Sequence, residues 1–224
     1  MALMTLGRRV VCKILQVLHS KLSLFFPKKG DVLMFHNFEE KEGLDFNCKP
    51  SDFEQLLVEL QCRNVIHLGD WKSQKNFVAL TIDDVPESFY RNAFPLLVKY
   101  KLPFTIFVNV GLLDTPGFIS SNQLKEMATN PLCTVGSHGM HHSFYKDFSS
   151  KDKETELRVS KMKLEQVIGK NVDLFAYPYG SYYACGFSAK HLVSKYYKYG
   201  FGTVSSSITT PILFPKYYLP RKNY

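Results

Sequence analysis

Apolar runs alternate with amphipathic segments along most of the chain. The runs are short, rich in β-branched and aromatic residues and bounded by turn residues, which is typical of buried strands. Strands are predicted at residues 31–36, 77–82, 103–110, 133–138, 172–180, 201–206 and 217–221. Helices are predicted at residues 51–61, 88–100, 120–129, 149–169 and 188–200. Such alternation predicts an α/β fold, an incomplete or distorted (β/α) barrel with six to seven parallel strands.

Local signals mark the ends of several predicted helices. Ser51 followed by Glu54 predicts a capping box at the first of them, and Gly169 marks the end of the longest. The polar run at residues 149–156 is interpreted as the solvent-exposed start of that longest helix.

The first 29 residues differ from the rest of the chain. Lys13, His19 and Lys21 interrupt the apolar residues, so no run reaches the roughly 18 residues of a membrane span. No cleavage-site pattern of a signal peptide follows. One side of a helix would be apolar, formed by Val11, Leu15, Leu18, Leu22 and Phe25. We predict a basic amphipathic helix at residues 1–29 ahead of a domain at residues 30–224, with residues 8–27 either lying on an anionic membrane or packing on that domain.

Composition and charge narrow the function classes. The 224 residues suit one domain, and the net charge of +8 suits an anionic membrane surface or a phosphate-bearing substrate. Basic residues cluster at both ends: Arg8, Arg9, Lys28, Lys29, Lys216, Arg221 and Lys222. No motif for binding RNA or DNA accompanies them, so no nucleic-acid partner is expected. The five cysteines are widely spaced without a CxxC pair, which predicts reduced thiols and favours a cytoplasmic setting.

Two adjacent carboxylates end a buried strand in "VALTIDDVPESFY", residues 78–90. Neighbouring acids raise each other's pKa unless a cation or hydrogen bonds compensate. One interpretation is that Asp83 and Asp84 cap the next helix. The other is a metal site in which one carboxylate is a ligand and the other a base.

A histidine cluster follows another predicted strand. In "GSHGMHHSFY", His138 and His142 are four residues apart, a spacing that lets two imidazoles bind one ion where the segment turns. Alone, this spacing equally fits a surface loop. His36 and Tyr179 also follow predicted strands, and the carboxyl ends of parallel strands meet at one edge. Two imidazoles and one carboxylate would leave a coordination position open, as in catalytic zinc sites.

Three motifs in order resemble the polysaccharide deacetylase family, also called the NodB-homology or carbohydrate esterase 4 type. "LTIDDVP" resembles its TFDDG motif, "SHGMHH" its H-[S/T]-x-x-H motif and "FAYPYG" its third motif. The resemblance covers roughly residues 31–221. "VLMFH", "SDFEQLLVEL" and "LPR" are similar to the exopolysaccharide poly-N-acetylglucosamine deacetylase branch.

The resemblance implies a role for each matching residue. Asp83 matches the catalytic base, and Asp84, His138 and His142 match the ligands of a divalent metal. Tyr179 matches the residue whose backbone N–H helps to hold the oxyanion. Zinc suits this ligand set best, although cobalt and nickel also fit it.

The chain departs from the family pattern at three places. Val85, followed by a proline, replaces the glycine of the first motif, which puts the shape of that turn in doubt. Ala176 replaces the arginine that orients the catalytic carboxylate, and Arg221 is the candidate substitute; the alternative is a surface charge near the C-terminus. The late LxH motif that supplies the acid is missing, so His36 is the candidate general acid; the alternative is an ordinary histidine at a strand end.

The resemblance implies a hydrolase that removes N-acetyl groups from amino sugars of a cell-surface polysaccharide or its lipid-linked precursor. Deformylase or peptidoglycan deacetylase activity on the same scaffold is an alternative, as is a catalytically impaired homologue that only binds glycan. Tyr179 and Tyr182 are the aromatic residues expected to line the sugar groove. A cytoplasmic protein, peripheral at the membrane, is expected, although many relatives act outside the membrane.

Overall fold

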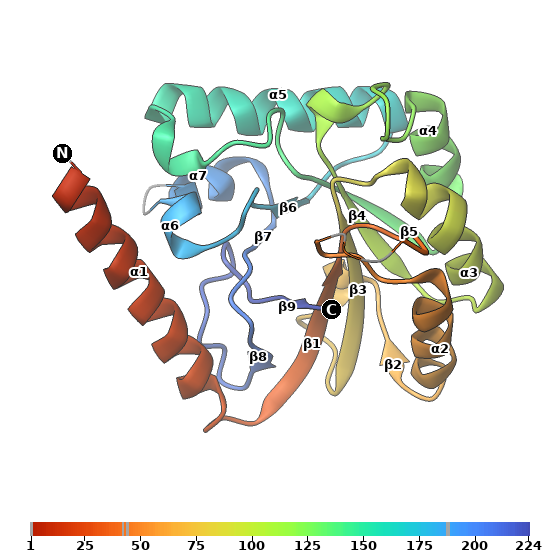
Figure 1. Cartoon of the computed structure of the whole chain (residues 1–224), viewed down its shortest axis with the longest axis horizontal. Coiled ribbons are helices and arrows are strands. Elements are labelled where there is room, and N and C mark those ends of the chain that lie inside the picture. Colours follow the sequence, from red (N-terminus) through yellow and green to blue (C-terminus); the bar gives the residue numbers. More distant parts are fainter. Residues whose placement is uncertain (1, 42, 44, 187–188) are drawn as a thin grey trace.

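The computed structural model describes residues 2–41, 43, 45–186 and 189–224, and its centre is one curled sheet (Figure 1). Six parallel strands run in the order β7-β6-β5-β4-β3-β1. Their bounds are β1 Lys28–Phe35, β3 Phe77–Asp83, β4 Phe104–Val108, β5 Cys133–Ser137, β6 Leu174–Ala176 and β7 Tyr199–Phe201. The predicted incomplete (β/α) barrel is thereby confirmed.

Three two-residue strands complete the sheet in the described part of the chain. They are β2 Asn64–Val65, β8 Ile208–Thr209 and β9 Lys222–Asn223. β2 pairs with β3, whereas β8 and β9 both pair with β1, β8 in the antiparallel direction. The sheet is therefore mostly parallel and mixed only at this edge.

The C-terminal segment crosses the gap between the first and last parallel strands. Leu219 N donates to Gly200 O at 2.8 Å, and Gly202 N donates to Leu219 O at 2.8 Å, which ties the segment to β7. Three residues later β9 begins and pairs with Leu33 and Met34 of β1. The last strand is therefore at 222–223 and not at 217–221 as predicted, because residues 217–221 are used to span the gap.

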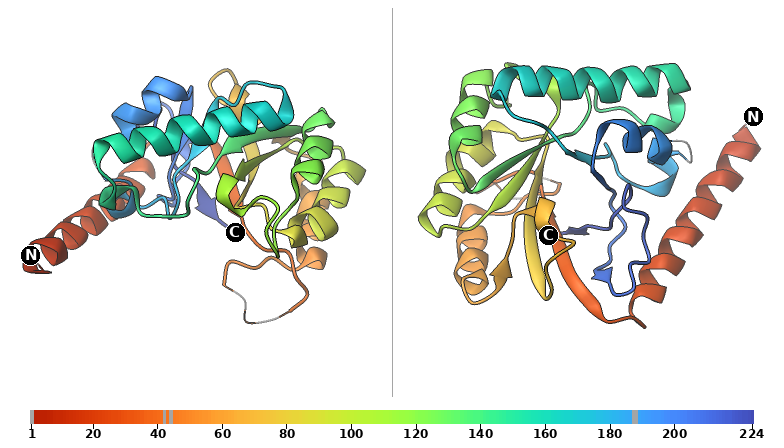
Figure 2. Two further views of the ribbon diagram at one scale, coloured as in Figure 1. Left: turned by 90° about the horizontal axis from the view of Figure 1, so that it is seen from above. Right: turned by 180° about the vertical axis from the view of Figure 1, so that it is seen from behind.

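Helices cover the outer side of the sheet (Figures 1 and 2). They are α2 Pro50–Leu60, α3 Phe94–Lys99, α4 Ser121–Thr129, α5 Ser150–Ile168, α6 Tyr182–Cys185 and α7 Ala189–Tyr196. A π-helical turn, Phe89–Ala93, precedes α3, and single 3₁₀ turns lie at Leu68–Asp70, Val110–Leu112 and Tyr145–Asp147. Their apolar residues form one large core with the sheet, while a second cluster, which includes Trp71, Phe107 and Phe201, fills the concave side.

Two local predictions about helix ends were wrong. The capping box at Ser51 does not form, because α2 begins at Pro50 in the first turn and its N-cap, Lys49, makes no side-chain cap bond. The run at 149–156 is not fully solvated, since Lys153 and Glu156 are both buried. A capping box does form two helices later, between Ser120, the N-cap of α4, and Gln123.

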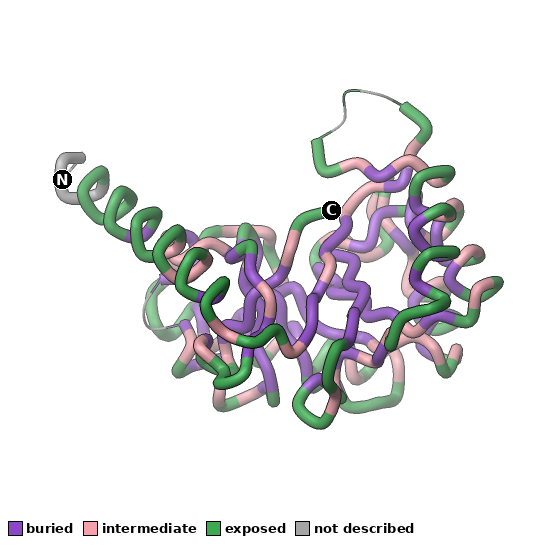
Figure 3. Tube along the Cα trace, turned by 90° about the horizontal axis from the view of Figure 1, so that it is seen from below, coloured by how far each residue is buried: buried purple, intermediate pink, exposed green. Residues whose placement is uncertain are grey.

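The N-terminal helix α1, Ala2–Ser23, lies along one side of the molecule, with its first residues farthest from the rest (Figures 1 and 2). It contacts the domain through Cys12, His19 and Ser23, whereas four of the five residues of the predicted apolar side, Val11, Leu18, Leu22 and Phe25, are exposed. The fifth, Leu15, lines a cavity against the domain. Figure 3 shows most of this helix as exposed. None of the described helices is long and apolar enough to cross a membrane.

Candidate metal centre and catalytic cleft

A cleft of about 620 Å³ opens at the carboxyl ends of the parallel strands. Its walls come from the segments that follow β1, β3, β5 and β6 and from the stretch after β7. It is lined by Met34, His36, Asn37, Asp45, Phe46, Asp83, Asp84, Pro86, Phe118, His138, His142, Tyr177, Tyr179, Thr203, Ser205 and Asn223. Six of the seven site residues predicted from sequence line this cleft, and the seventh, Arg221, lies directly behind Asp83.

Asp84, His138 and His142 come together at the floor of the cleft. One ligand atom from each lies within 4.8 Å of the others. His138 Nε2 is 3.8 Å from Asp84 Oδ1, and His142 Nε2 is 3.7 Å from Asp84 Oδ2. Donor atoms this close, two imidazole nitrogens and a carboxylate, can bind one divalent ion and leave a further position open.

The backbone fixes the orientation of His138. Its N–H donates to Val108 O at 2.8 Å, and its ring Nδ1 lies 2.9 Å from Ala176 O. Since a carbonyl oxygen only accepts, Nδ1 carries the proton and Nε2 presents its lone pair to the cleft. Burial, together with the nearby His142 and Arg221, lowers the pKa of His138 despite the opposing charges of Asp83 and Asp84, which favours the neutral imidazole that a metal requires.

The turn that carries Asp84 is unusual for its residue types. Asp84 and Val85 adopt φ values of +60° and +54°, the left-handed region that β-branched residues avoid. Val85 is fully buried, and its carbonyl accepts a hydrogen bond from Ile119 N, so core packing holds the turn that a glycine would adopt freely. Asp84 Oδ1 is buried and has no hydrogen-bond partner among the described residues. An orphaned buried carboxylate oxygen beside two imidazoles fits a bound cation.

Glu156 of α5 holds the loop between the two histidines. Its Oε2 accepts hydrogen bonds from Met140 N and His141 N, both at 3.1 Å, and its Oε1 lies 2.5 Å from His141 Nδ1. His141 therefore points at Glu156 and not at the ligand cluster. Sequence reasoning missed Glu156, because an acid on a charged helix carries no signal that it is buried.

Asp83 pairs with Arg221 inside the barrel. The two guanidinium nitrogens donate to the two carboxylate oxygens at 2.6 and 2.7 Å, and both side chains are almost completely buried. Arg221 also donates to Gly202 O and Thr81 Oγ1, and it lies over the ring of Phe107. Burial alone would raise the pKa of Asp83, but Arg221 and then His138 lower it to about 2. The carboxylate is therefore ionised and fixed in orientation at neutral pH.

Two further predicted residues face the same cleft. His36 directly follows β1, and its Nδ1 is buried without a hydrogen-bond partner among the described residues. Tyr179 has φ +59° in the turn after β6, and no described residue accepts a hydrogen bond from its backbone N–H. Its ring stacks on Phe144 and contacts His142, so it borders the metal cluster. Tyr182, by contrast, lies beside α1 in a separate cavity and does not line this cleft.

Comparisons with known proteins agree with this geometry. The polysaccharide deacetylase family model matches residues 71–191, more than half of the chain. The poly-beta-1,6-N-acetyl-D-glucosamine N-deacetylase of Staphylococcus aureus strain MRSA252 is 32% identical over 189 residues, covering 72% of this chain and 65% of that protein. The chain thus spans a little less than two thirds of this relative's length.

Solved structures show the same fold. A polysaccharide deacetylase from Bacillus cereus has a TM-score of 0.78 and 26% identity, over 88% of this chain and 65% of the other. A Streptococcus pyogenes deacetylase, solved with acetate, has a TM-score of 0.79 and 23% identity, over 88% and 92% of the two chains. With the three motifs converging in one cleft, the match over residues 71–191 establishes that this chain belongs to the polysaccharide deacetylase family.

Proposed function

We propose that this protein is a metal-dependent hydrolase that removes N-acetyl groups from the amino sugars of a cell-surface polysaccharide or its lipid-linked precursor. The observation that carries the proposal is the convergence of two features in one cleft. The cluster of Asp84, His138 and His142 adjoins a buried carboxylate, Asp83, that Arg221 holds ionised. The name of the staphylococcal relative supports the choice of an N-acetylated amino sugar.

Asp84, His138 and His142 would hold the metal, and zinc is the ion we propose. A bound divalent ion in such a site polarises the amide carbonyl and makes bound water more acidic. Two neutral imidazoles with one carboxylate suit zinc, and they also suit cobalt and nickel. Metal analysis of the purified protein decides between these ions.

The residues of the chain would carry the proton transfers. Water adds to the acetamide carbonyl carbon while Asp83 accepts a proton from it. Arg221 keeps the Asp83 carboxylate in place during this step, as the bidentate pair indicates. The backbone N–H of Tyr179 would donate to the oxyanion. The C–N bond then breaks, acetate leaves, and His36 would give a proton to the departing amine.

Acetate release from N-acetylglucosamine oligomers tests the proposal. We expect release that a chelator abolishes and that added zinc or cobalt restores. Asp83→Asn should abolish turnover while metal still binds, because Asp83 lies outside the ligand set. His36→Asn should lower kcat by about 10²- to 10⁴-fold without loss of metal. Glycan binding without any release, with metal bound, would instead support the impaired homologue. Release of formate from an N-formylated amino sugar, with no acetate from the acetylated oligomers, would support a deformylase.

We also propose that the protein works at the cytoplasmic surface of a membrane. All five cysteines are free, which suits a reducing compartment. The basic residues near the N-terminus suit an anionic lipid surface. Fractionation of cells that produce the full chain, with protease protection to identify the side of the membrane, tests this location.

A further inference from the structure

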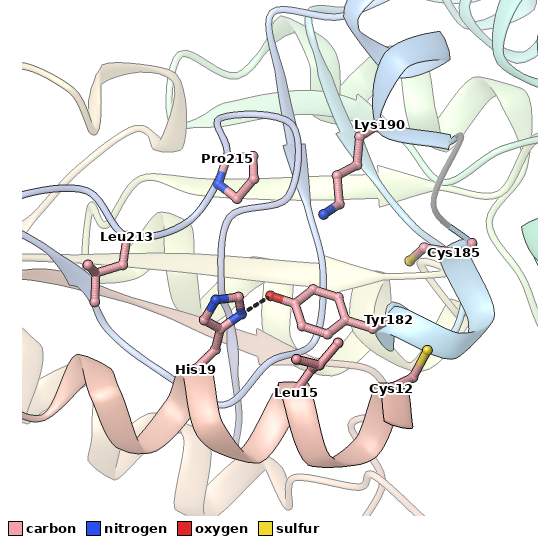
Figure 4. Close-up of a pocket in the computed structure, with 9 residues that line it drawn as sticks. Cys12, Leu15, His19, Tyr182, Cys185, Lys190, Leu213 and Pro215 are labelled. Carbon is pink, nitrogen blue, oxygen red and sulfur yellow. Dashed lines mark hydrogen bonds between the residues drawn. The ribbon is translucent and has the colours of Figure 1, made fainter. Parts of the chain in front are cut away.

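The N-terminal helix docks on the domain with the side opposite to the expected one. Its inward side includes Cys12, Gln16, His19, Ser20 and Ser23, mostly polar residues, and Leu15 also lines the cavity between the helix and the domain. Ser20 Oγ donates to Ser205 O at 2.6 Å, and Ser23 Oγ shares a 2.6 Å hydrogen bond with Ser206 Oγ. Figure 4 shows the ring of His19 against the hydroxyl of Tyr182, at 2.6 Å. Hydrogen bonds therefore help to attach this helix, together with packing of Cys12, Leu15 and the His19 ring.

The outward side of α1 is almost entirely apolar. Seven large apolar side chains, each 46–63% exposed, cover it: Leu6, Val10, Val11, Ile14, Val17, Leu18 and Leu22. Leu24 and Phe25, just beyond the helix, are 82% and 83% exposed. A helix on the surface of a water-soluble protein normally packs its apolar side against the core. The exposed apolar side of α1 therefore indicates that another molecule or a lipid surface covers it.

The charge of the N-terminal segment indicates what covers this apolar side. Residues 2–30 contain six cations, Arg8, Arg9, Lys13, Lys21, Lys28 and Lys29, and the first acid along the chain is Asp31. Two copies facing each other through this side would bring their cations together with no acid on the segment to offset them. An anionic lipid surface offers both an apolar layer for the leucines and valines and negative head groups for the lysines and arginines.

The helix also adjoins the cleft. The carbonyl of Ser205 that accepts the hydrogen bond from Ser20 belongs to a residue lining the cleft, and Thr203 O lies 3.5 Å from Gln16 Nε2. One short stretch, residues 203–206, therefore lies between α1 and the candidate active site. A surface that binds the outward side of α1 therefore lies close to the cleft as well.

We propose that the outward face of α1, Leu6 to Leu22 with Leu24 and Phe25, inserts into the interfacial layer of an anionic phospholipid membrane and keeps the cleft at the bilayer surface. This proposal rests on the proposed deacetylase function only for the identity of the substrate, which would then be a membrane-associated glycan. The helix lies in the plane of the interface and does not span the membrane.

Vesicle flotation of the full chain tests the proposal. Vesicles of phosphatidylcholine with phosphatidylglycerol should bind the protein, and vesicles of phosphatidylcholine alone should bind it far less. High salt should weaken the binding because it screens the cations. Ile14→Glu and Leu18→Glu should each lower binding to the mixed vesicles by roughly tenfold or more, since each removes an apolar side chain from the lipid. Met162→Glu, an equally exposed apolar position on α5, should leave binding unchanged.

Controls separate this proposal from the catalytic one. The variants should keep the melting temperature and the rate of acetate release from soluble oligomers, since neither position touches the cleft. Acetate release without vesicle binding would overturn the membrane proposal and leave the deacetylase standing; vesicle binding without release would do the reverse. Unchanged binding in both glutamate variants would also overturn it. The proposal would also be overturned if the protein does not bind vesicles but forms a dimer in sedimentation velocity that Leu18→Glu dissociates. The apolar face of α1 would then be a contact between copies.

Discussion

Both ends of the chain are rich in basic residues, but the basic side chains lie in opposite environments in the fold. At the N-terminus, Lys13 and Lys21 are exposed on a helix whose apolar side faces outward. At the C-terminus, Arg221 is completely buried and forms a bidentate pair with Asp83. A buried cation needs a partner of opposite charge, whereas an exposed one keeps its hydration. Basic residues therefore hold a candidate catalytic carboxylate at one end of the chain and accompany a candidate lipid-facing surface at the other.

Replacing Arg221 should have the largest effect. Arg221→Ala leaves Asp83 buried without its counter-charge, which should lower the free energy of unfolding by about 3–5 kcal/mol and abolish acetate release. Denaturant unfolding and the acetate assay measure these effects. Arg221→Lys keeps the charge but loses the paired geometry, so it should recover part of the stability and little of the activity.

Lys222→Ala is the matched control for Arg221→Ala. Lys222 is the next residue, is partly exposed and pairs with Asp31 at 2.8 Å. We expect a much smaller loss of stability and retained activity. Equal losses from the two alanine variants would contradict the contrast between buried and exposed cations.

Glu156 extends the comparison to a buried acid whose partners are mainly backbone N–H groups. Glu156→Ala should weaken metal binding by roughly 10- to 100-fold, because the loop between His138 and His142 loses its anchor. Titration with cobalt, followed by its absorption spectrum, measures this change. Glu165→Ala, on the same helix but paired with Lys161, should bind cobalt like the parent protein. If Glu156→Gln binds cobalt as weakly as Glu156→Ala, the hydrogen bonds between residue 156 and the loop are not what maintains metal affinity.

Asp31 of β1 pairs with Lys222 of β9. It therefore allows a smaller, pH-dependent test of the contact between these two strands. Burial would raise its pKa, but hydrogen bonds from Lys222, Lys28 and Ser207 lower it below the usual 3.8. A lowered folded-state pKa stabilises the fold above the unfolded value, and this contribution is lost as pH falls through the folded-state value. Asp31→Asn should therefore destabilise the protein at pH 7 and differ little from the parent in thermal melts at a pH well below 3.8. An equal difference at both values would contradict the ionic contribution.

The exposed cations of α1 should matter least to stability. Lys13→Ala and Lys21→Ala should shift the melting temperature by less than about 2 °C, since both residues are exposed. A larger shift would mean that these lysines support the fold itself. Flotation of these two variants and of the parent protein with anionic vesicles then measures the effect of the lysines on lipid binding.

The sequence by itself determined the alternation of strands and helices, and hence the parallel barrel. It also brought the two acids and the histidine cluster to one edge, because residues that follow parallel strands meet there. The resemblance to the family motifs then implied Asp84, His138 and His142 as the ligand set. These inferences hold because apolar periodicity is a local property, and because strands that alternate with helices favour parallel pairing.

Only the tertiary structure decided which charges are buried and which helix face points outward. Arg221 reaches Asp83 because residues 217–221 cross the gap between β7 and β1, over a separation of 138 positions in the sequence. Glu156 became an anchor because α5 packs beside the histidine loop. The apolar side of α1 faces outward while Ser20 donates a hydrogen bond to Ser205 O and Ser23 accepts one from Ser206 on the inward side. Helical periodicity reveals that two faces differ, but long-range contacts choose the face that is buried.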